Sequence, residues 1–343
     1  LLPPPLRSRV CMVLLLLRRG ARNLPSLRRF STGNKRLVLP TWQACAAVPI
    51  GAAAGFCTSV IGVGSAAVLV PALTLGLGLP QVVASSTGLA ATLFGVTAGA
   101  AKYADADSVQ MGVAAVLSPA AMLSSVAGAR ASARMSDRTL RLIWATLALS
   151  IAAASVKSAR DVMVDAGQRP ADDASVASTL VRRVSAALLP TTAEDDSGRV
   201  ALGLMTRLER ARVRVAEEIG AMRPEVAARH ILAGLTVGFM NGLLGVSGTP
   251  IVMSYLSLFT DCTQHQVLGT ALIAVMPAIL IASVTHFRMG NIHPQLCLCL
   301  MVGSVSGSVA GANVSLELPE AHLKLLFAGA MTIIGCSILR ASL

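Results

Sequence analysis

The chain repeats itself. A shift of 183 residues brings two long apolar stretches into register without a gap, so that Gly62-Val63 matches Gly245-Val246 and the run 126–129 matches 309–312. Further identities at this offset pair Gly55 with Gly238, Leu73 with Leu256, Gln81 with Gln264, Thr87 with Thr270 and Leu140 with Leu323. A duplicated block of about a hundred apolar residues is a common architecture of membrane transporters, which hold substrate where the repeats meet.

The distribution of charge indicates a membrane protein. Only 13% of the residues are charged, against roughly 25% in soluble domains. Eleven of the 17 acidic residues lie in 155–230, and nine of the 29 basic residues precede Trp42. This pattern predicts an all-α polytopic membrane protein in contact with the lipid bilayer. The net charge of +12 comes largely from the leader, and no basic stripe alternates with aromatic residues, so no nucleic-acid partner is predicted.

The amino-terminal leader has the composition of an organelle transit peptide. No acidic residue occurs before Asp105, and the leader is rich in arginine, leucine and serine. The string Arg28-Arg29-Phe30-Ser31 resembles the cleavage region of mitochondrial presequences, which favours import to the mitochondrial inner membrane. The alternatives are a positive-inside anchor or a signal peptide, although the apolar core 13–17 is shorter than the usual 7–15 residues.

Ten apolar segments follow the leader, five in each half. They are 43–61, 63–79, 83–103, 109–129 and 140–156, then 230–244, 246–262, 266–286, 292–312 and 323–339. Several approach the ~20 residues that cross a bilayer. The first two segments of each half are shorter and flank a glycine-rich break, as broken or re-entrant helices do. We therefore expect eight to ten membrane segments.

Loop charges predict that the two repeats are inverted. In the first half the loop 104–108 is acidic and 130–141 carries four arginines, whereas in the second half 287–293 is basic and 313–324 is mainly acidic. Basic residues in short loops mark the inner side of a membrane. An odd number of segments per repeat would produce this inversion.

Four parts therefore make up the predicted organisation. They are a basic leader (1–42), a first transmembrane repeat (43–156), a charged soluble linker (157–229) and a second transmembrane repeat (230–343). Leu204, Leu208, Val215 and Ile219 recur at helical spacing in the linker, as in a soluble amphipathic helix. The favoured interpretation is a solvated connector without chemistry of its own.

The two breaks are the candidate substrate site. Glycine lets the backbone leave helical geometry, and in a membrane such backbone persists only where protein or a water-filled cavity satisfies it. Amides freed at a helix start attract anions, so a small anionic substrate is predicted. The predicted binding residues are Gly62, Gly64, Ser65, Thr87, Gly245, Ser247, Gly248, Thr249 and Thr270. The alternative is that these small residues merely permit close helix packing.

Both halves also resemble a known repeat. The residues that carry the likeness are Gly51, Gly55, Gly62-Val63-Gly64, Pro71-Ala72-Leu73 and Thr87, then Gly234, Gly238, Gly242, Gly245-Val246, Gly248, Thr270 and Gly290-Asn291-Ile292. They are similar to the repeat of the sulfite exporter TauE/SafE family of membrane permeases, over about 43–156 and 231–343. The resemblance implies transport of sulfite, organosulfonates or related small organic anions.

The chain departs from this family pattern within the breaks. Ser65-Ala66 replaces two glycines in the first break, and Ser247 and Thr249 replace two in the second. The identity of the anion is therefore open. No ionisable residue lies in the middle of an apolar segment, and His286 is expected to be interfacial, so proton coupling, exchange and passive flux all stay open.

Two other functions are alternatives to transport. Gly245-Val246-Ser247-Gly248 also fits an intramembrane serine protease of the rhomboid type, with His286 or His293 as the base. The first repeat has glycine at the position of Ser247, which argues against an enzyme. A membrane scaffold without transport activity is the other alternative. The cysteines form no Cys-x-x-Cys pair, so neither a metal site nor a cofactor is predicted.

Overall fold

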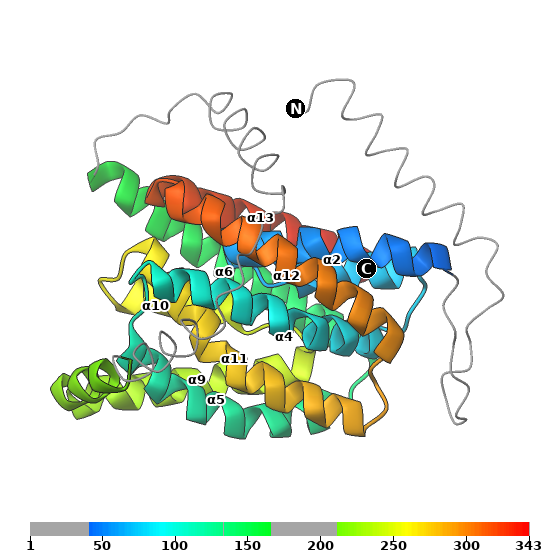
Figure 1. Cartoon of the computed structure of the whole chain (residues 1–343), viewed down its shortest axis with the longest axis horizontal. Helices are drawn as coiled ribbons and strands as arrows, with labels where there is room; N and C mark the ends of the chain where they lie inside the picture. The colour runs from blue at the N-terminus through cyan, green and yellow to red at the C-terminus, as the bar shows by residue number, and fades with distance from the viewer. Residues whose placement is uncertain (1–40, 133, 166–210, 343) are drawn as a thin grey trace, which may run out of the picture.

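The computed structural model describes residues 41–132, 134–165 and 211–342, and every regular element within them is helical (Figure 1). The first half contains α2 (Thr41–Ile61), α3 (Ala66–Pro71), the π-helical segment η1 (Ala72–Gly76), α4 (Gln81–Asp105), α5 (Met111–Ser132) and α6 (Asp137–Asp165). The second half contains α9 (Pro224–Leu244), α10 (Thr249–Phe259), α11 (Gln264–Arg288), α12 (Pro294–Glu317) and α13 (Glu320–Ser342). Most of the predicted leader (1–40) and of the linker (166–210) lies outside the described residues.

The helix bounds repeat at the offset found in the sequence. Helices α4 and α11 both run for 25 residues, and α2 and α9 both run for 21. Helix α10 covers the interval that corresponds to α3 and η1 together. The duplicated sequence therefore adopts a duplicated order of helices.

Local sequence explains where these helices begin and end. Helix α11 starts with a capping box, in which the Thr263 hydroxyl accepts the N–H of Gln266 while the Gln266 side chain accepts the N–H of Thr263. Helix α9 begins at Pro224, where the missing N–H costs no hydrogen bond, and its C-cap is Gly245 in the left-handed conformation. Its first turns carry polar residues, which is why the apolar pattern placed its start later, at residue 230.

Six helical stretches of the described residues are long and apolar enough to cross a membrane. They are Gln81–Asp105, Met111–Ser132, Arg138–Val156, Gln264–Arg288, Pro294–Glu317 and Glu320–Arg340. Two shorter apolar stretches, Ala46–Ile61 and Thr249–Phe259, flank the breaks. This is fewer than the eight to ten segments expected, because the predicted count also included the helices that flank the two breaks.

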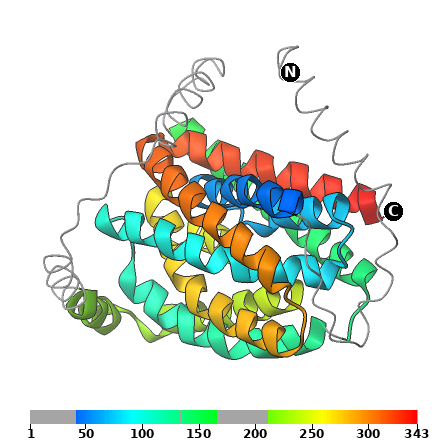
Figure 2. The same ribbon diagram turned by 45° about the vertical axis from the view of Figure 1, so that its right-hand side comes forward.

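Equivalent helices of the two halves pack in equivalent pairs. Helix α2 packs along α12, and α9 packs along α5. Helices α4 and α11 are the most buried of the candidate spans, and they contact each other as well as α12 and α5 respectively. Helices α6 and α13 pack together, with more of their surface exposed. In Figures 1 and 2 the α2–α12 pair and the α5–α9 pair lie on opposite sides of α4 and α11.

The two outer pairs are held by close backbone approach at glycine. A Cβ added at Gly55 of α2 would overlap the carbonyl oxygen of Ser304 in α12. The equivalent Gly238 of α9 meets the carbonyl oxygen of Ala121 in α5 in the same way. Small residues permit such contact between membrane helices, where packing drives association because lipid is as apolar as the side chains.

A first prediction concerns these close contacts. We expect Gly55→Ala to lower the melting temperature, because α2 and α12 must separate, at a cost of about 1–3 kcal/mol. The matched control is Gly329→Ala in α13, where an added Cβ meets nothing within 4 Å and helix propensity favours alanine by up to ~1 kcal/mol. Thermal unfolding of both purified variants checks this, and equal melting temperatures would contradict close packing at Gly55.

The end of the predicted linker is structured. Residues 211–221 are helical. The Glu218 carboxylate accepts the backbone N–H of Gly112 at 2.6 Å, and Arg214 forms an ion pair with Asp107. The hydrogen bond and the negative charge of Asp107 raise the pKa of the Arg214 guanidinium. This part of the linker therefore docks on the α4–α5 connection, whereas the sequence favoured a solvated segment.

Candidate functional site

The glycine breaks are irregular backbone inside the protein. Residues 62–65 separate α2 from α3, and residues 245–248 separate α9 from α10. Gly62, Gly64 and Gly245 adopt positive φ angles of 74°, 80° and 61°, which side chains other than glycine rarely adopt. All residues of both breaks are buried.

The two breaks meet each other. A Cβ built on Gly64 would lie 3.3 Å from the Cβ of Ser247, which is the equivalent position in the other repeat. Gly62 faces Met253 of α10 and Leu268 of α11, and Gly245 faces Ser85 of α4. The predicted glycine residues therefore come together in the protein interior, at the contact between the halves, and do not face lipid.

Hydroxyl groups line both breaks. The hydroxyls of Ser247 and Thr249 lie 2.5 Å apart, and both side chains are almost fully buried. In the first break the Ser65 hydroxyl pairs with that of Thr92, which the sequence analysis did not single out. Gly248 takes the position equivalent to Ser65, and a Cβ there would lie 2.6 Å from Val237 Cγ1. The second break is therefore tightly packed at Gly248 and polar at Ser247 and Thr249.

The two predicted threonines join helices. The Thr87 hydroxyl of α4 accepts the backbone N–H of His293 at 3.0 Å, directly before α12. The Thr270 hydroxyl of α11 accepts the backbone N–H of Gln110 at 2.9 Å, directly before α5. These bonds are equivalent in the two repeats and satisfy amides at helix starts. Both threonine hydroxyls therefore form hydrogen bonds between helices, and a contact with substrate would be an additional role.

The structure also reveals a buried amide that the sequence analysis missed. Asn241 of α9 is 0% exposed, and neither its side-chain nitrogen nor its side-chain oxygen has a hydrogen-bond partner. It lies one helical turn after Val237, on the face that contacts Gly248. An unsatisfied buried polar group costs about 1–3 kcal/mol, so its retention calls for an explanation. Its position four residues before Gly245 was the available sequence signal.

His286, which was expected at the membrane interface, lies in the last turn of α11 and is buried by protein. Its side chain is 1% exposed, its Nε2 lies 3.2 Å from the carbonyl oxygen of Gly242, and its Nδ1 has no partner. Tyr103 occupies the equivalent position in α4 and donates its hydroxyl to the carbonyl oxygen of Ser59 at 2.7 Å. Each side chain thus holds a carbonyl of the broken helix shortly before its break. The local sequence, which ends in Arg288, suggested a helix end in the interface, but packing on α9 covers the ring.

The contacts of these histidines do not assemble a serine protease. The Ser247 hydroxyl is hydrogen bonded to Thr249, and His286 is directed to Gly242. His293 accepts the N–H of Leu296 through Nδ1 as the N-cap of α12. A serine nucleophile needs a base within hydrogen-bond reach, and His286 does not fill this role.

The buried polar residues in the described part of the chain are serine, threonine, asparagine, glutamine and histidine, with no acidic or basic residue of another type among them. The one guanidinium atom buried among the described residues without a hydrogen bond is Arg141 Nε. Such an interior suits a solute bound by neutral donors between two repeats. A family model for the sulfite exporter TauE/SafE matches residues 8–156 and 200–343. The chain belongs to the sulfite exporter TauE/SafE family. With six candidate spans among its described residues, this TauE/SafE member is an integral multi-pass membrane protein.

Two bacterial proteins are similar to this TauE/SafE member. The probable membrane transporter protein YdhB of Bacillus subtilis (strain 168) is 30% identical over 99 residues, which are 29% of this chain and 40% of YdhB. The probable membrane transporter protein YunE of the same organism is 21% identical over 113 residues, which are 33% of this chain and 41% of YunE. The chain thus aligns with about two fifths of each relative. No solved structure matches it. The family and these names support membrane transport over catalysis.

Proposed function

We propose that this protein transports a small anion, of the sulfite or organosulfonate type, through a site between its two glycine breaks. The observation that carries the proposal is the contact of Gly64 with Ser247. These equivalent positions meet where both backbones are irregular and buried. Transporters built from repeats bind substrate between discontinuous helices at such a place.

The chemistry of the breaks favours a negative solute. Helix α10 begins at Thr249, whose hydroxyl lies beside that of Ser247. The N-terminal end of a helix carries a partial positive charge, which attracts anions. The Asn241 side chain offers two further donors without partners. Because no buried carboxylate lies among the described residues, nothing of like charge opposes an anion there.

We further propose that the two repeats have opposite orientations in the membrane. The hydrogen bond from His293 to Thr87 joins the starts of α12 and α4, so these helices run parallel. The bond from Gln110 to Thr270 joins the starts of α5 and α11 in the same way. A short loop connects α4 to α5, which makes them antiparallel. The equivalent helices α4 and α11 therefore point in opposite directions, in agreement with the loop charges.

Flux into liposomes that contain the purified protein tests transport. We expect uptake of sulfite or an organosulfonate above that of empty liposomes, saturable with substrate concentration. A panel with sulfite, sulfoacetate, thiosulfate and acetate distinguishes sulfur oxyanions from organic anions in general. No flux of any of these anions, from protein that remains folded, would contradict the transport function and favour a scaffold.

The cellular location is a separate proposal. We propose the mitochondrial inner membrane, on the basis of the arginine-rich, acid-free leader with Arg28-Arg29-Phe30-Ser31. These residues lie outside the described part of the chain. Import of the radiolabelled chain into isolated mitochondria, with loss of the leader, is the expected result. A full-length product that stays accessible to external protease would contradict it.

A further inference from the structure

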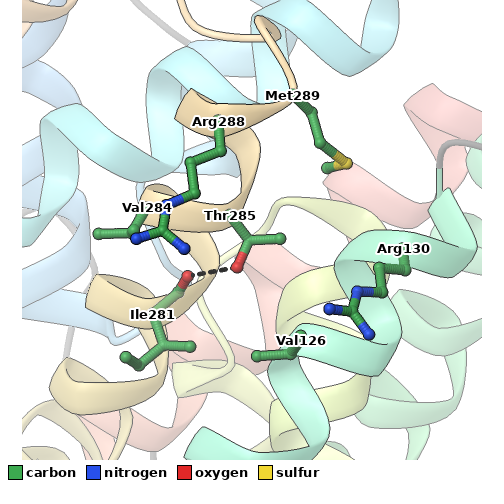
Figure 3. Close-up of a pocket in the computed structure, with 7 residues that line it drawn as sticks. All are labelled: Val126, Arg130, Ile281, Val284, Thr285, Arg288 and Met289. Atoms are coloured by element: carbon green, nitrogen blue, oxygen red, sulfur yellow. Dashed lines mark hydrogen bonds between the residues drawn. The ribbon is translucent and has the colours of Figure 1, made fainter.

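A cleft opens between α5 and α11, lined by residues other than those of the glycine breaks. The two helices run parallel and are joined at their starts by the bond from Gln110 to Thr270. Near their C-terminal ends this open cleft has a volume of about 430 Å³ and is lined from α5 by Val126 and Arg130. The rest of its lining runs from Ile281 of α11 to Met289, which directly follows this helix (Figure 3).

Two arginines flank the cleft. The guanidinium groups of Arg130 and Arg288 lie on opposite sides of it in Figure 3. Neither forms an ion pair with any residue in the described part of the chain. The Thr285 hydroxyl between them donates to the carbonyl oxygen of Ile281, so the arginines are the free donors. Arginine presents a planar set of donors that suits phosphate oxygens.

The repeat itself does not require this charge. The positions equivalent to Arg130 and Arg288 in the other half are Asn313 and Asp105. The equivalent contact of α12 with α4 therefore packs without a pair of arginines. The positive cleft is specific to the contact of α5 with α11.

The other side chains that line the cleft are mainly apolar, and they adjoin an exposed apolar surface of α11. Val126, Ile281 and Val284 line the cleft, and Val284 is 41% exposed. Leu280 and Phe287 of α11 are exposed beside it. In a multi-pass membrane protein this surface contacts lipid chains. A ligand of the cleft must combine a negative group with an apolar tail.

We propose that this cleft binds an anionic phospholipid, with its phosphate between Arg130 and Arg288 and an acyl chain along Val126, Ile281 and Val284. Basic pockets between membrane helices on the side rich in arginine bind such headgroups. Three further arginines, Arg134, Arg138 and Arg141, follow α5 at the same end. The occupant is a lipid because a free anion would leave the apolar walls uncovered. This inference does not depend on the identity of the transported solute.

Native mass spectrometry of the full chain in detergent tests the proposal. We expect phosphatidylglycerol to bind at least tenfold more tightly than phosphatidylcholine with the same acyl chains. Arg130→Gln combined with Arg288→Gln should remove this preference. The control combines Arg134→Gln with Arg138→Gln, which removes the same charge from the neighbouring surface outside the cleft and should keep it.

Two further arms distinguish a lipid from a free anion. Val284→Trp fills the cleft without changing its charge and should weaken phosphatidylglycerol binding. Soluble glycerol 3-phosphate should fail to displace the lipid at tenfold excess. Equal binding of both lipids, an equal loss in the control variant, unchanged binding in Val284→Trp, or displacement by glycerol 3-phosphate would each overturn the proposal.

Discussion

Gly62→Ala is expected to reduce anion flux by more than tenfold and to lower the melting temperature. Gly62 has φ +74°, and its added Cβ would overlap the Met253 Sδ of α10. The left-handed conformation alone costs roughly 1–2 kcal/mol for a residue with a Cβ. Movement of Met253 would also disturb the contact between the two breaks. Liposome flux and thermal unfolding of the same preparation measure both effects.

Gly290→Ala is the matched control for this variant. Gly290 has φ +73°, and an added Cβ there meets nothing within 4 Å. It lies in the loop that follows α11, so alanine carries the conformational cost without the overlap. We expect a smaller decrease in melting temperature and unchanged flux. Equal losses of flux in both variants would show that Gly62 acts only through overall stability.

Asn241→Leu is expected to abolish flux while raising the melting temperature. The Asn241 amide is fully buried without hydrogen bonds, and each unsatisfied group costs about 1–3 kcal/mol. Leucine has a similar volume and no polar atoms, so it removes this cost together with the proposed donors. Opposite changes in stability and activity separate a binding role from a structural one.

Thr236→Leu is the control on the same helix. Thr236 is exposed, and its hydroxyl is bonded to the Leu232 carbonyl oxygen within α9. Its replacement should leave flux unchanged. Normal flux in Asn241→Leu would show that Asn241 does not contribute to substrate binding. A lower melting temperature of this variant would show that the amide makes a stabilising contact.

Much of the fold follows from the local sequence. Glycine at positions 62 and 245 permits the positive φ angles at which α2 and α9 end. Proline and capping residues fix helix starts such as Pro224 and Thr263. The apolar segments could be recognised without knowledge of which helices they contact, because any helix that spans a bilayer needs a long apolar stretch. The positions of the two breaks were predictable to the same extent, and the substrate site proposed there stays a prediction.

Side-chain partners were far less predictable. Membrane helices are apolar on all sides, so their sequence does not indicate which face meets another helix. His286 therefore looked interfacial, although α9 covers it. The sequence did not predict a role for Asn241, because its lack of a hydrogen-bond partner depends on the helices that surround it. Thr87 and Thr270 were expected at the substrate, and only the fold revealed that they accept backbone amides of other helices.

The sequence by itself determined the duplication, the membrane class, the order of helices and the positions of the two breaks. Each of these depends on residues close together in the chain or on a fixed repeat. Only the tertiary structure decided that Gly64 meets Ser247, that Asn241 is buried without a partner, and that Arg130 faces Arg288 across a cleft. These relations join residues about 160–180 positions apart, or depend on every helix around them. They arise when helices pack, since packing selects one set of neighbours among many that apolar surfaces would allow.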